Sequence, residues 1–209
     1  MYKVKEIYYT LQGEGAQTGR PAIFCRFTGC NLWTGLEKDR DKAICQFCDT
    51  DFWGMDGENG GKYTAASLAE KVIGLWPDKD QGQPYVVCTG GEPLLQMDEE
   101  LIAAFHEVGL HIAVETNGTI KAPAGLDWIC VSPKANAELL LTKGDELKVI
   151  FPQKNAEPEL YDKLDFDHLF LQPMDGPQGM ENTKLTLNYC LENPKWRLSL
   201  QTHKWLEIK

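Results

Sequence analysis

The sequence has no long apolar stretch, no internal repeat and few histidines. No window approaches the ~18 consecutive apolar residues that a membrane helix needs, and residues 1–15 lack the apolar run of a secretory signal. Solenoid and propeller folds are excluded by the absence of a repeat. We therefore expect a cytoplasmic protein with no membrane partner.

Positive charge is scarce as well. The 21 Lys and Arg residues stand against 31 Asp and Glu residues, which gives a formal net charge of -10. This balance argues against a nucleic-acid groove built on bulk positive charge, so no nucleic-acid partner is expected. An anionic substrate would need a local basic pocket. With 209 residues, 43% of them hydrophobic, the chain suits a single globular domain over 1–209.

From residue 84 on, short apolar runs alternate with helical patterns. Strands are expected at 22–27, 85–88, 111–115, 127–131, 146–151, 168–171 and 196–200. Helices are expected at 65–75, 98–108 and 183–191, with a weaker one near 158–164. This alternation predicts an α/β fold with a parallel sheet, either open and doubly wound or curled into a full or partial barrel.

Polar or glycine clusters follow five of these strands. They are TGGE at 89–92, ETNG at 115–118, SPK at 132–134, QPMD at 172–175 and QTHK at 201–204. In parallel α/β folds, ligands bind outside the carboxyl ends of the strands. One such cluster would be read as ordinary turn residues, but five in series predict a common binding site.

Three of the seven cysteines form a spaced set. Cys45 and Cys48 make a C-x2-C pair, and Cys30 precedes Cys45 by fourteen intervening residues. The spacing fits a zinc site with a remote fourth ligand, although the first histidine is His106. It also fits a redox pair, or an iron-sulfur cluster with one iron left open to a small molecule. The other four cysteines, Cys25, Cys88, Cys130 and Cys190, suit core packing.

These cysteines occur together with several other motifs. GCNLW at 29–33, CDT at 48–50 and TGGEP at 89–93 resemble the radical S-adenosylmethionine superfamily. The sequence is more closely similar to its 7-carboxy-7-deazaguanine synthase family, on the segments YTLQGEG, PAIFCRFTGCNLW, CQFCDTDF, ETNG, VSPK, LQPMDG and RLSLQTHKWLEIK. The superfamily more often spaces its cysteines C-x3-C-x2-C, so the longer interval here indicates a subgroup with an altered cluster loop.

The resemblance implies a partial (β/α) barrel with a cluster-binding loop at about 30–62. It also implies conversion of 6-carboxy-5,6,7,8-tetrahydropterin to 7-carboxy-7-deazaguanine, with loss of ammonia, through a radical generated from S-adenosylmethionine. Mg²⁺, a reductant protein such as flavodoxin and a homodimer are further expectations of this kind. Two alternatives stay open: an activase acting on a protein partner, and a non-catalytic zinc or iron-sulfur protein.

Site residues are carried over from the resemblance by motif. Cys30, Cys45 and Cys48 would hold a 4Fe-4S cluster. The S-adenosylmethionine site would comprise Phe47, Cys48, Asp49, Gly91, Ser132, Pro133, Lys134, Gln172, Pro173, Met174 and Asp175. The paired glycines of TGGEP would let the backbone approach the methionine group closely.

Thr50 resembles a residue that gives an oxygen to Mg²⁺, a hard cation that prefers oxygen ligands. The pterin site would comprise Leu11, Gln12, Gly13, Glu14, Arg26, Thr89, Glu115 and Lys209. Arg26 alternates with Cys25 and Phe27, so its side chain points away from theirs. An inward arginine needs a partner, and a substrate carboxylate suits it. The family commonly has proline where this sequence has Lys209.

Overall fold

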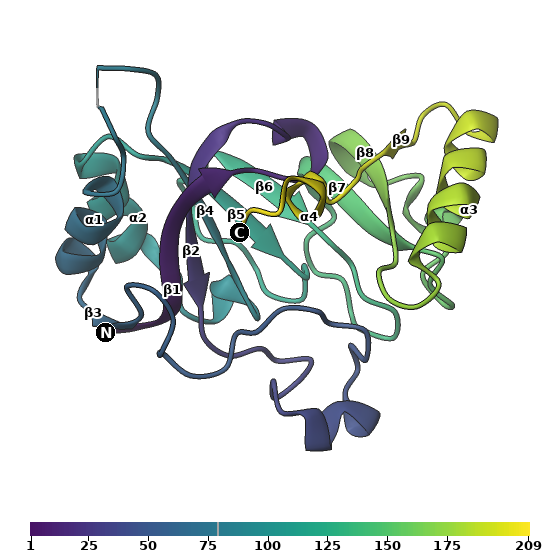
Figure 1. Ribbon diagram of the computed structural model, residues 1–209, viewed down its shortest axis with the longest axis horizontal. Coiled ribbons are helices and arrows are strands. Elements are labelled where there is room, and N and C mark those ends of the chain that lie inside the picture. Colours follow the sequence, from purple (N-terminus) through teal and green to yellow (C-terminus); the bar gives the residue numbers. More distant parts are fainter. Residues whose placement is uncertain (79) are drawn as a thin grey trace.

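A curved, open sheet forms the centre of the computed structural model, which describes residues 1–78 and 80–209 (Figure 1). Its strand order is β3-β1-β2-β4-β5-β6-β7-β8-β9. The parallel strands are β2 (Pro21–Phe27), β4 (Tyr85–Gly90), β5 (His111–Thr116), β6 (Trp128–Val131), β7 (Lys143–Phe151), β8 (Asp165–Pro173) and β9 (Arg197–Leu198). Strands β1 (Tyr2–Leu11) and β3 (Gly61–Tyr63) run antiparallel to their neighbours. The partial barrel of mainly parallel strands is confirmed.

Alternating side chains give the sheet two apolar faces. On the outer face, Val86 and Cys88 of β4 pack with helices α1 (Ala65–Ile73) and α2 (Glu99–Glu107). On the inner face, Tyr85 and Val87 join a smaller cluster with Ala113. Since successive strand residues point to opposite faces, short apolar runs fill both layers.

N-cap residues that are recognisable in the sequence precede the first two helices. The Thr64 hydroxyl accepts a hydrogen bond from the Ser67 N–H, and the Ser67 hydroxyl accepts one from the Thr64 N–H, which makes a capping box before α1. The Asp98 carboxylate accepts from the Leu101 N–H before α2. Both helices end within two residues of the predicted limits.

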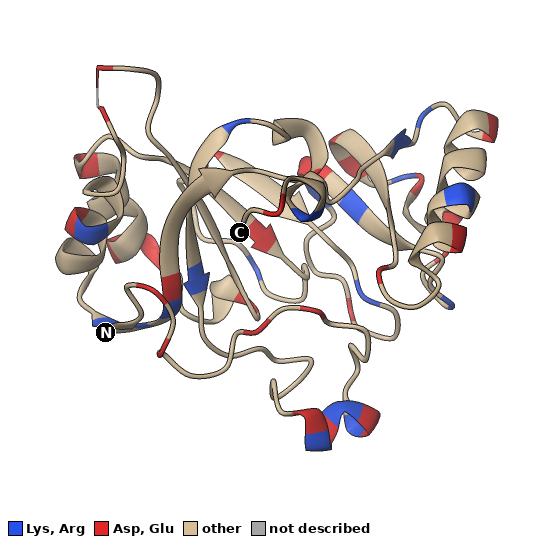
Figure 2. Cartoon of the chain, in the orientation of Figure 1, with Lys and Arg blue, Asp and Glu red and all other residues tan. Residues whose placement is uncertain are grey.

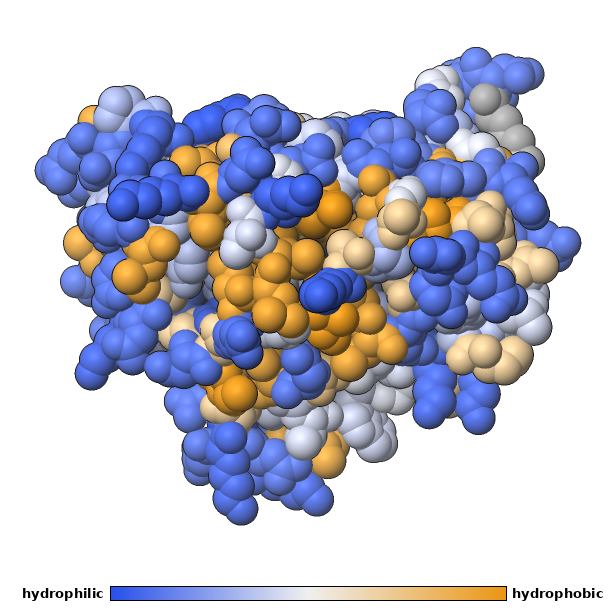
Figure 3. All heavy atoms as spheres, turned by 180° about the vertical axis from the view of Figure 1, so that it is seen from behind, coloured by the Kyte–Doolittle hydropathy of each residue, from blue (hydrophilic) through white to orange (hydrophobic). Residues whose placement is uncertain are grey.

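The β8–β9 end of the sheet is covered by α3 (Gly179–Glu192) (Figure 1). No helix lies between β5 and β6 or between β6 and β7 in the described residues. Figure 3 shows apolar surface gathered over the middle of the back face. Charges of both signs occur on α1, on α3 and on the short 3-10 helix η2 (Glu37–Lys42), as Figure 2 shows.

The structure corrects several predicted elements. The strand expected at 196–200 is reduced to Arg197–Leu198, after which the Ser199 N–H still donates to Leu171 O at 2.8 Å. The weak helix near 158–164 is a single 3-10 turn, η4 (Pro158–Tyr161). Strands β1 and β3, the 3-10 turns η1 (Gly15–Gln17) and η3 (Pro93–Leu95), and the short helix α4 (Thr202–Leu206) were not predicted.

Between β2 and β3 the chain forms a long loop in which η2 is the regular element. The loop contains Cys30, Cys45 and Cys48 and runs beneath the mouth of the sheet (Figure 1). The Arg40 guanidinium donates to the carbonyls of Gln46 and Cys48 at 2.9 and 3.1 Å, and it lies over the Trp33 ring. These contacts hold the second half of the loop against the first.

Among the helices of the described residues, none combines the length and the apolar character needed to cross a bilayer.

Candidate active site

A cavity of about 410 Å³ opens at the carboxyl ends of the parallel strands. All five strand-end clusters contribute to its wall, together with the cysteine loop and the end of β1. Most of the predicted ligand-site residues line it. The exceptions are Cys30, Pro133 and Met174, of which Cys30 lies behind the wall in a second, more open hollow of the loop. The predicted convergence of the clusters on one mouth is confirmed.

Cys45 and Cys48 lie together at one side of this cavity, with Cys30 behind its wall. The thiols of Cys45 and Cys48 hydrogen-bond to each other, which lowers the pKa of Cys48 to about 6 and raises that of Cys45. Cys30 is near enough for its charge to act on both. Within residues 1–78 and 80–209, no group of three or more His, Cys, Asp or Glu side chains could hold a single metal ion.

The cysteine arrangement fits a cluster in its donor chemistry. Each iron of a four-iron cluster takes one thiolate, so the thiols need not meet at one atom as they must in a closed zinc site. Cys45 and Cys48 also face the cavity, where a ligand on an open iron would lie. These residues therefore fit a three-thiolate 4Fe-4S site.

The paired glycines of TGGEP lie against the cysteine loop. A Cβ on Gly91 would stand 2.2 Å from Gly29 O and 2.7 Å from the Cβ of Cys30. Gly90 has a φ of 137° and a Cβ there would meet Phe27 O at 2.1 Å. Both positions thus need glycine, because a side chain on Gly91 would push the loop away from Cys30 and one on Gly90 would push it away from β2.

The carboxylate of Glu92 joins this loop to the end of β5. It is fully buried and accepts hydrogen bonds from the Thr116 hydroxyl and from the Asn117 and Leu94 N–H groups, at 2.8, 2.8 and 3.0 Å. Burial raises the pKa of Glu92, while these donors oppose the rise. The fourth residue of TGGEP thus holds two strand ends in register.

Lys134 projects from the end of β6 towards the cysteines. Its ammonium donates to Ser132 O at 2.8 Å and to Ser132 Oγ at 2.6 Å. Burial lowers the pKa of Lys134, and the negative charges of Cys45 and Cys48 work against that shift. A cation here would balance negative charge on a thiolate cluster or on a ligand carboxylate.

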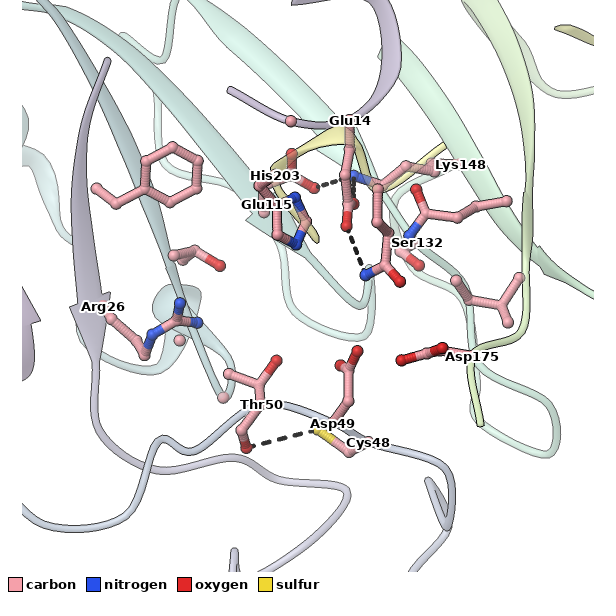
Figure 4. A pocket seen from close by; sticks show the side chains of 18 of the residues that line it. Glu14, Arg26, Cys48, Asp49, Thr50, Glu115, Ser132, Lys148, Asp175 and His203 are labelled. Atoms are coloured by element: carbon pink, nitrogen blue, oxygen red, sulfur yellow. Dashed lines mark hydrogen bonds and ion pairs between the residues drawn. The ribbon is translucent and has the colours of Figure 1, made fainter. Parts of the chain in front are cut away.

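A polar group forms the opposite wall, around the ammonium of Lys148 on β7 (Figure 4). Lys148 Nζ lies 2.8 Å from Glu14 Oε2 and 2.9 Å from Glu115 Oε2. Gln12 donates to Glu115 at 3.2 Å, and Gln201 donates to Glu14 at 2.9 Å. Lys148 was not predicted as a site residue, although it alternates with apolar neighbours in its strand as Arg26 does.

Arg26 does point into the cavity, as its strand alternation predicts (Figure 4). Within the molecule its partners are Glu6 and Tyr8: Nε donates to Glu6 Oε1 at 2.9 Å and Nη2 donates to the Tyr8 hydroxyl at 3.0 Å. In its bonds to other described residues, Arg26 uses only the N–H groups of Nε and Nη2. The N–H groups of Nη1 are left for a ligand.

The short helix α4 covers the cavity from the side of the cysteine loop and β8. Lys204 Nζ bridges Asp49 Oδ2 at 3.1 Å and Asp175 Oδ2 at 2.5 Å. Thr202 donates through both its N–H and its hydroxyl to Gly13 O, at 3.0 Å each. Segments near residues 13, 49, 175 and 202 therefore meet at one mouth.

His203 and Lys209 also reach the wall from this region. A Cβ on Gly13 would lie 2.3 Å from His203 Nδ1, so glycine is required for this contact. Burial lowers the pKa of His203. The Lys209 ammonium lies 2.9 Å from Glu58 Oε2 and above the Tyr8 ring. His203 and Lys204 belong to a predicted strand-end cluster but were not predicted as ligand contacts.

Curated proteins match this chain over nearly its whole length. A 7-carboxy-7-deazaguanine synthase of Caulobacter vibrioides is 61% identical over 208 residues, which are 99% of each chain. One of Burkholderia multivorans is 58% identical over the same length and coverage.

Among solved structures, QueE from Escherichia coli matches with a TM-score of 0.72 and 28% identity, covering 96% of this chain and 93% of that one. No family model matches the chain. The cysteine loop, the TGGEP turn and the strand-end wall thus occur in a chain that is similar over its whole length to these synthases. The chain belongs to the 7-carboxy-7-deazaguanine synthase family of radical S-adenosylmethionine enzymes.

Proposed function

We propose that this protein converts 6-carboxy-5,6,7,8-tetrahydropterin to 7-carboxy-7-deazaguanine with loss of ammonia. One observation carries the proposal. A single cavity is lined by thiols, by an arginine that suits the carboxylate of an acidic pterin, and by two carboxylates that suit its ring N–H groups. The family membership supports the same reaction.

Cys30, Cys45 and Cys48 would hold a 4Fe-4S cluster, and Lys134 lies beside two of them. The cluster and S-adenosylmethionine together would supply a one-electron reductive cleavage that starts radical chemistry on the substrate. The surrounding side chains bind and orient the reactants and exclude water. The proposed S-adenosylmethionine contacts are Phe47, Cys48, Asp49 and Gly91, together with the segments 132–134 and 172–175.

The pterin would lie against the opposite wall. Its carboxylate would pair with the Nη1 donors of Arg26, since a guanidinium and a carboxylate match in charge and planar geometry. The N–H groups of its aminopyrimidinone ring need acceptors, which Glu14 and Glu115 offer as carboxylates. Leu11, Gln12, Gly13, Thr89 and Lys209 complete the proposed contacts, all of them on the cavity wall.

Thr50 is proposed to give an oxygen to Mg²⁺ next to the substrate carboxylate. Its position on the wall between Asp49 and Asp51, both exposed to the cavity mouth, supports a hard-cation site. A homodimer, a small reductant protein such as flavodoxin and a cytoplasmic location are proposed on the strength of the family alone.

The test is anaerobic reconstitution with iron and sulfide, followed by turnover with S-adenosylmethionine, a reductant and the carboxylated tetrahydropterin. We expect a 4Fe-4S absorption spectrum and the deazaguanine acid by mass spectrometry. Cys48→Ala should lose both, whereas Cys190→Ala, on helix α3 away from the cavity, should keep both. Cleavage of S-adenosylmethionine without any product from the pterin would refute the proposed substrate.

A further inference from the structure

Lys148 is the central cation of the polar wall, and nothing in the proposed chemistry yet uses it. Its side chain is 4% exposed, and it pairs with carboxylates from two separate parts of the chain. Glu14 lies in the turn after β1, and Glu115 lies in β5. In Figure 4 the ammonium lies beside both carboxylates at the upper side of the cavity, opposite Cys48, Asp49 and Thr50.

Without Lys148, several carboxyl groups would face one another in this part of the cavity with no cation between them. Besides Glu14 and Glu115, the buried carboxyl of Glu146 lies nearby and accepts from the Ala16 N–H at 3.0 Å. Cys130 and Lys134 also act on this region electrostatically. Burial alone would raise the pKa of Glu14, yet the charge and hydrogen bond of Lys148, with Gln201, lower it to about 2.

The ionised state of these two carboxylates matters for binding. A carboxylate only accepts hydrogen bonds, whereas a carboxylic acid also donates one. The ring N–H groups of an aminopyrimidinone need hydrogen-bond acceptors, so the carboxylates that face them must stay unprotonated. Two half-buried carboxylates that face each other without a cation repel, and this repulsion favours protonation of one of them.

We propose that Lys148 is a positioning residue that keeps Glu14 and Glu115 aligned as paired acceptors for the aminopyrimidinone edge of the substrate. This inference rests on the proposed function, since it takes a pterin as the ligand. Gln12 and Gln201 extend the same network, because each donates to one of the two carboxylates. Lys148 therefore acts through its neighbours.

The test measures binding of 6-carboxy-5,6,7,8-tetrahydropterin to the wild type and to Lys148→Met, anaerobically, from about pH 5 to about pH 8. The wild-type measurement shows how far protonation of the pterin itself changes the dissociation constant with pH. Lys148→Met removes the charge but keeps much of the length, and Lys148→Arg keeps the charge. Lys195→Met is the matched control, because Lys195 pairs with Asp162 at 2.5 Å outside the cavity. Thermal melting and S-adenosylmethionine binding report the fold.

We expect Lys148→Met to raise the pterin dissociation constant about 10- to 100-fold at neutral pH, the effect of losing one charge-assisted hydrogen bond. The loss should grow as the pH falls, because the freed carboxyl of Glu14 becomes protonated and one of its oxygens then donates a hydrogen bond. Lys148→Arg should restore the wild-type pH profile, and Lys195→Met should match the wild type throughout.

Two results would overturn the inference while leaving the proposed function intact. One is a Lys148→Met dissociation constant within about twofold of the wild type. The other is a weakened constant with an unchanged pH profile and an equal loss of S-adenosylmethionine binding. If the wild type binds no pterin, both this inference and the proposed function fail.

Discussion

The buried carboxylate of Glu92 accepts a hydrogen bond of 2.8 Å from the backbone N–H of Asn117, across two neighbouring strand ends. Glu92→Gln would turn one accepting oxygen into a donor that faces these N–H and O–H groups. We expect the free energy of unfolding to fall by about 2 kcal/mol or more, because buried donors lose their acceptor. Urea denaturation measures this. Glu70→Gln, an exposed change on α1, should leave the value unchanged.

Gly91→Ala should prevent cluster assembly, because the new Cβ would collide with Gly29 O and with Cys30. We expect iron bound after reconstitution to fall by about half or more. Gly179→Ala is a suitable control, since its nearest contact would be an ordinary 3.6 Å to Asp175. Full iron loading of Gly91→Ala would contradict the close approach.

Arg26→Ala should impair substrate use selectively. Removing the guanidinium takes away the Nη1 donors and leaves Glu6 without its 2.9 Å partner. We expect KM for the pterin to rise about 10- to 100-fold, with little change in the cleavage of S-adenosylmethionine alone. Kinetics on both reactions measure the difference, with the exposed Arg197→Ala as control. An equal loss in both reactions would argue for a general structural role.

Thr50→Val should abolish the response of turnover to added Mg²⁺. Valine has nearly the shape of threonine but lacks the hydroxyl, so a metal-ligand oxygen is lost with little change in packing. A titration of activity against Mg²⁺ after chelation measures the response. Thr183→Val on helix α3 should respond as the wild type does. A normal Mg²⁺ titration in Thr50→Val would remove this residue from the metal site.

Acid should destabilise the protein partly through Glu14. Its pKa is about 2 in the folded state against an ordinary value of 4.5. A lowered pKa means that the stabilisation is complete above pH 4.5 and is lost as the pH falls towards 2. Urea unfolding over this range should show a weaker pH dependence for Glu14→Gln than for the wild type. Identical slopes would mean that the pair with Lys148 adds nothing to stability.

The parallel strands could be predicted because each is an apolar run with a polar end. Strand β1 could not, since its alternation breaks at a bulge between Val4 and Glu6, which shifts the following side chains relative to β2. Helix α4 has five residues, too few to show a helical period. The predicted start of helix α3 is four residues too late, because residues 179–182 carry little apolar pattern.

The common mouth of the site followed from strand polarity, since carboxyl ends of parallel strands share one edge. Alternation identified Arg26, and the same rule applied to Leu147 and Val149 would have identified Lys148. The Lys204 bridge is different, because Asp49 and Lys204 are 155 residues apart. No local pattern encodes a contact that depends on how the whole sheet curves.

The hydrogen bonds from Thr202 to Gly13 O have a consequence for biosynthesis. Residue 13 leaves the ribosome long before residue 202, so this side of the cavity cannot close until nearly the whole chain is made. The cysteines at 30, 45 and 48 emerge early. Since α4 forms part of the wall beside Cys48, we expect this wall to stay incomplete until α4 is made, which would leave iron and sulfide an open route to the cysteines.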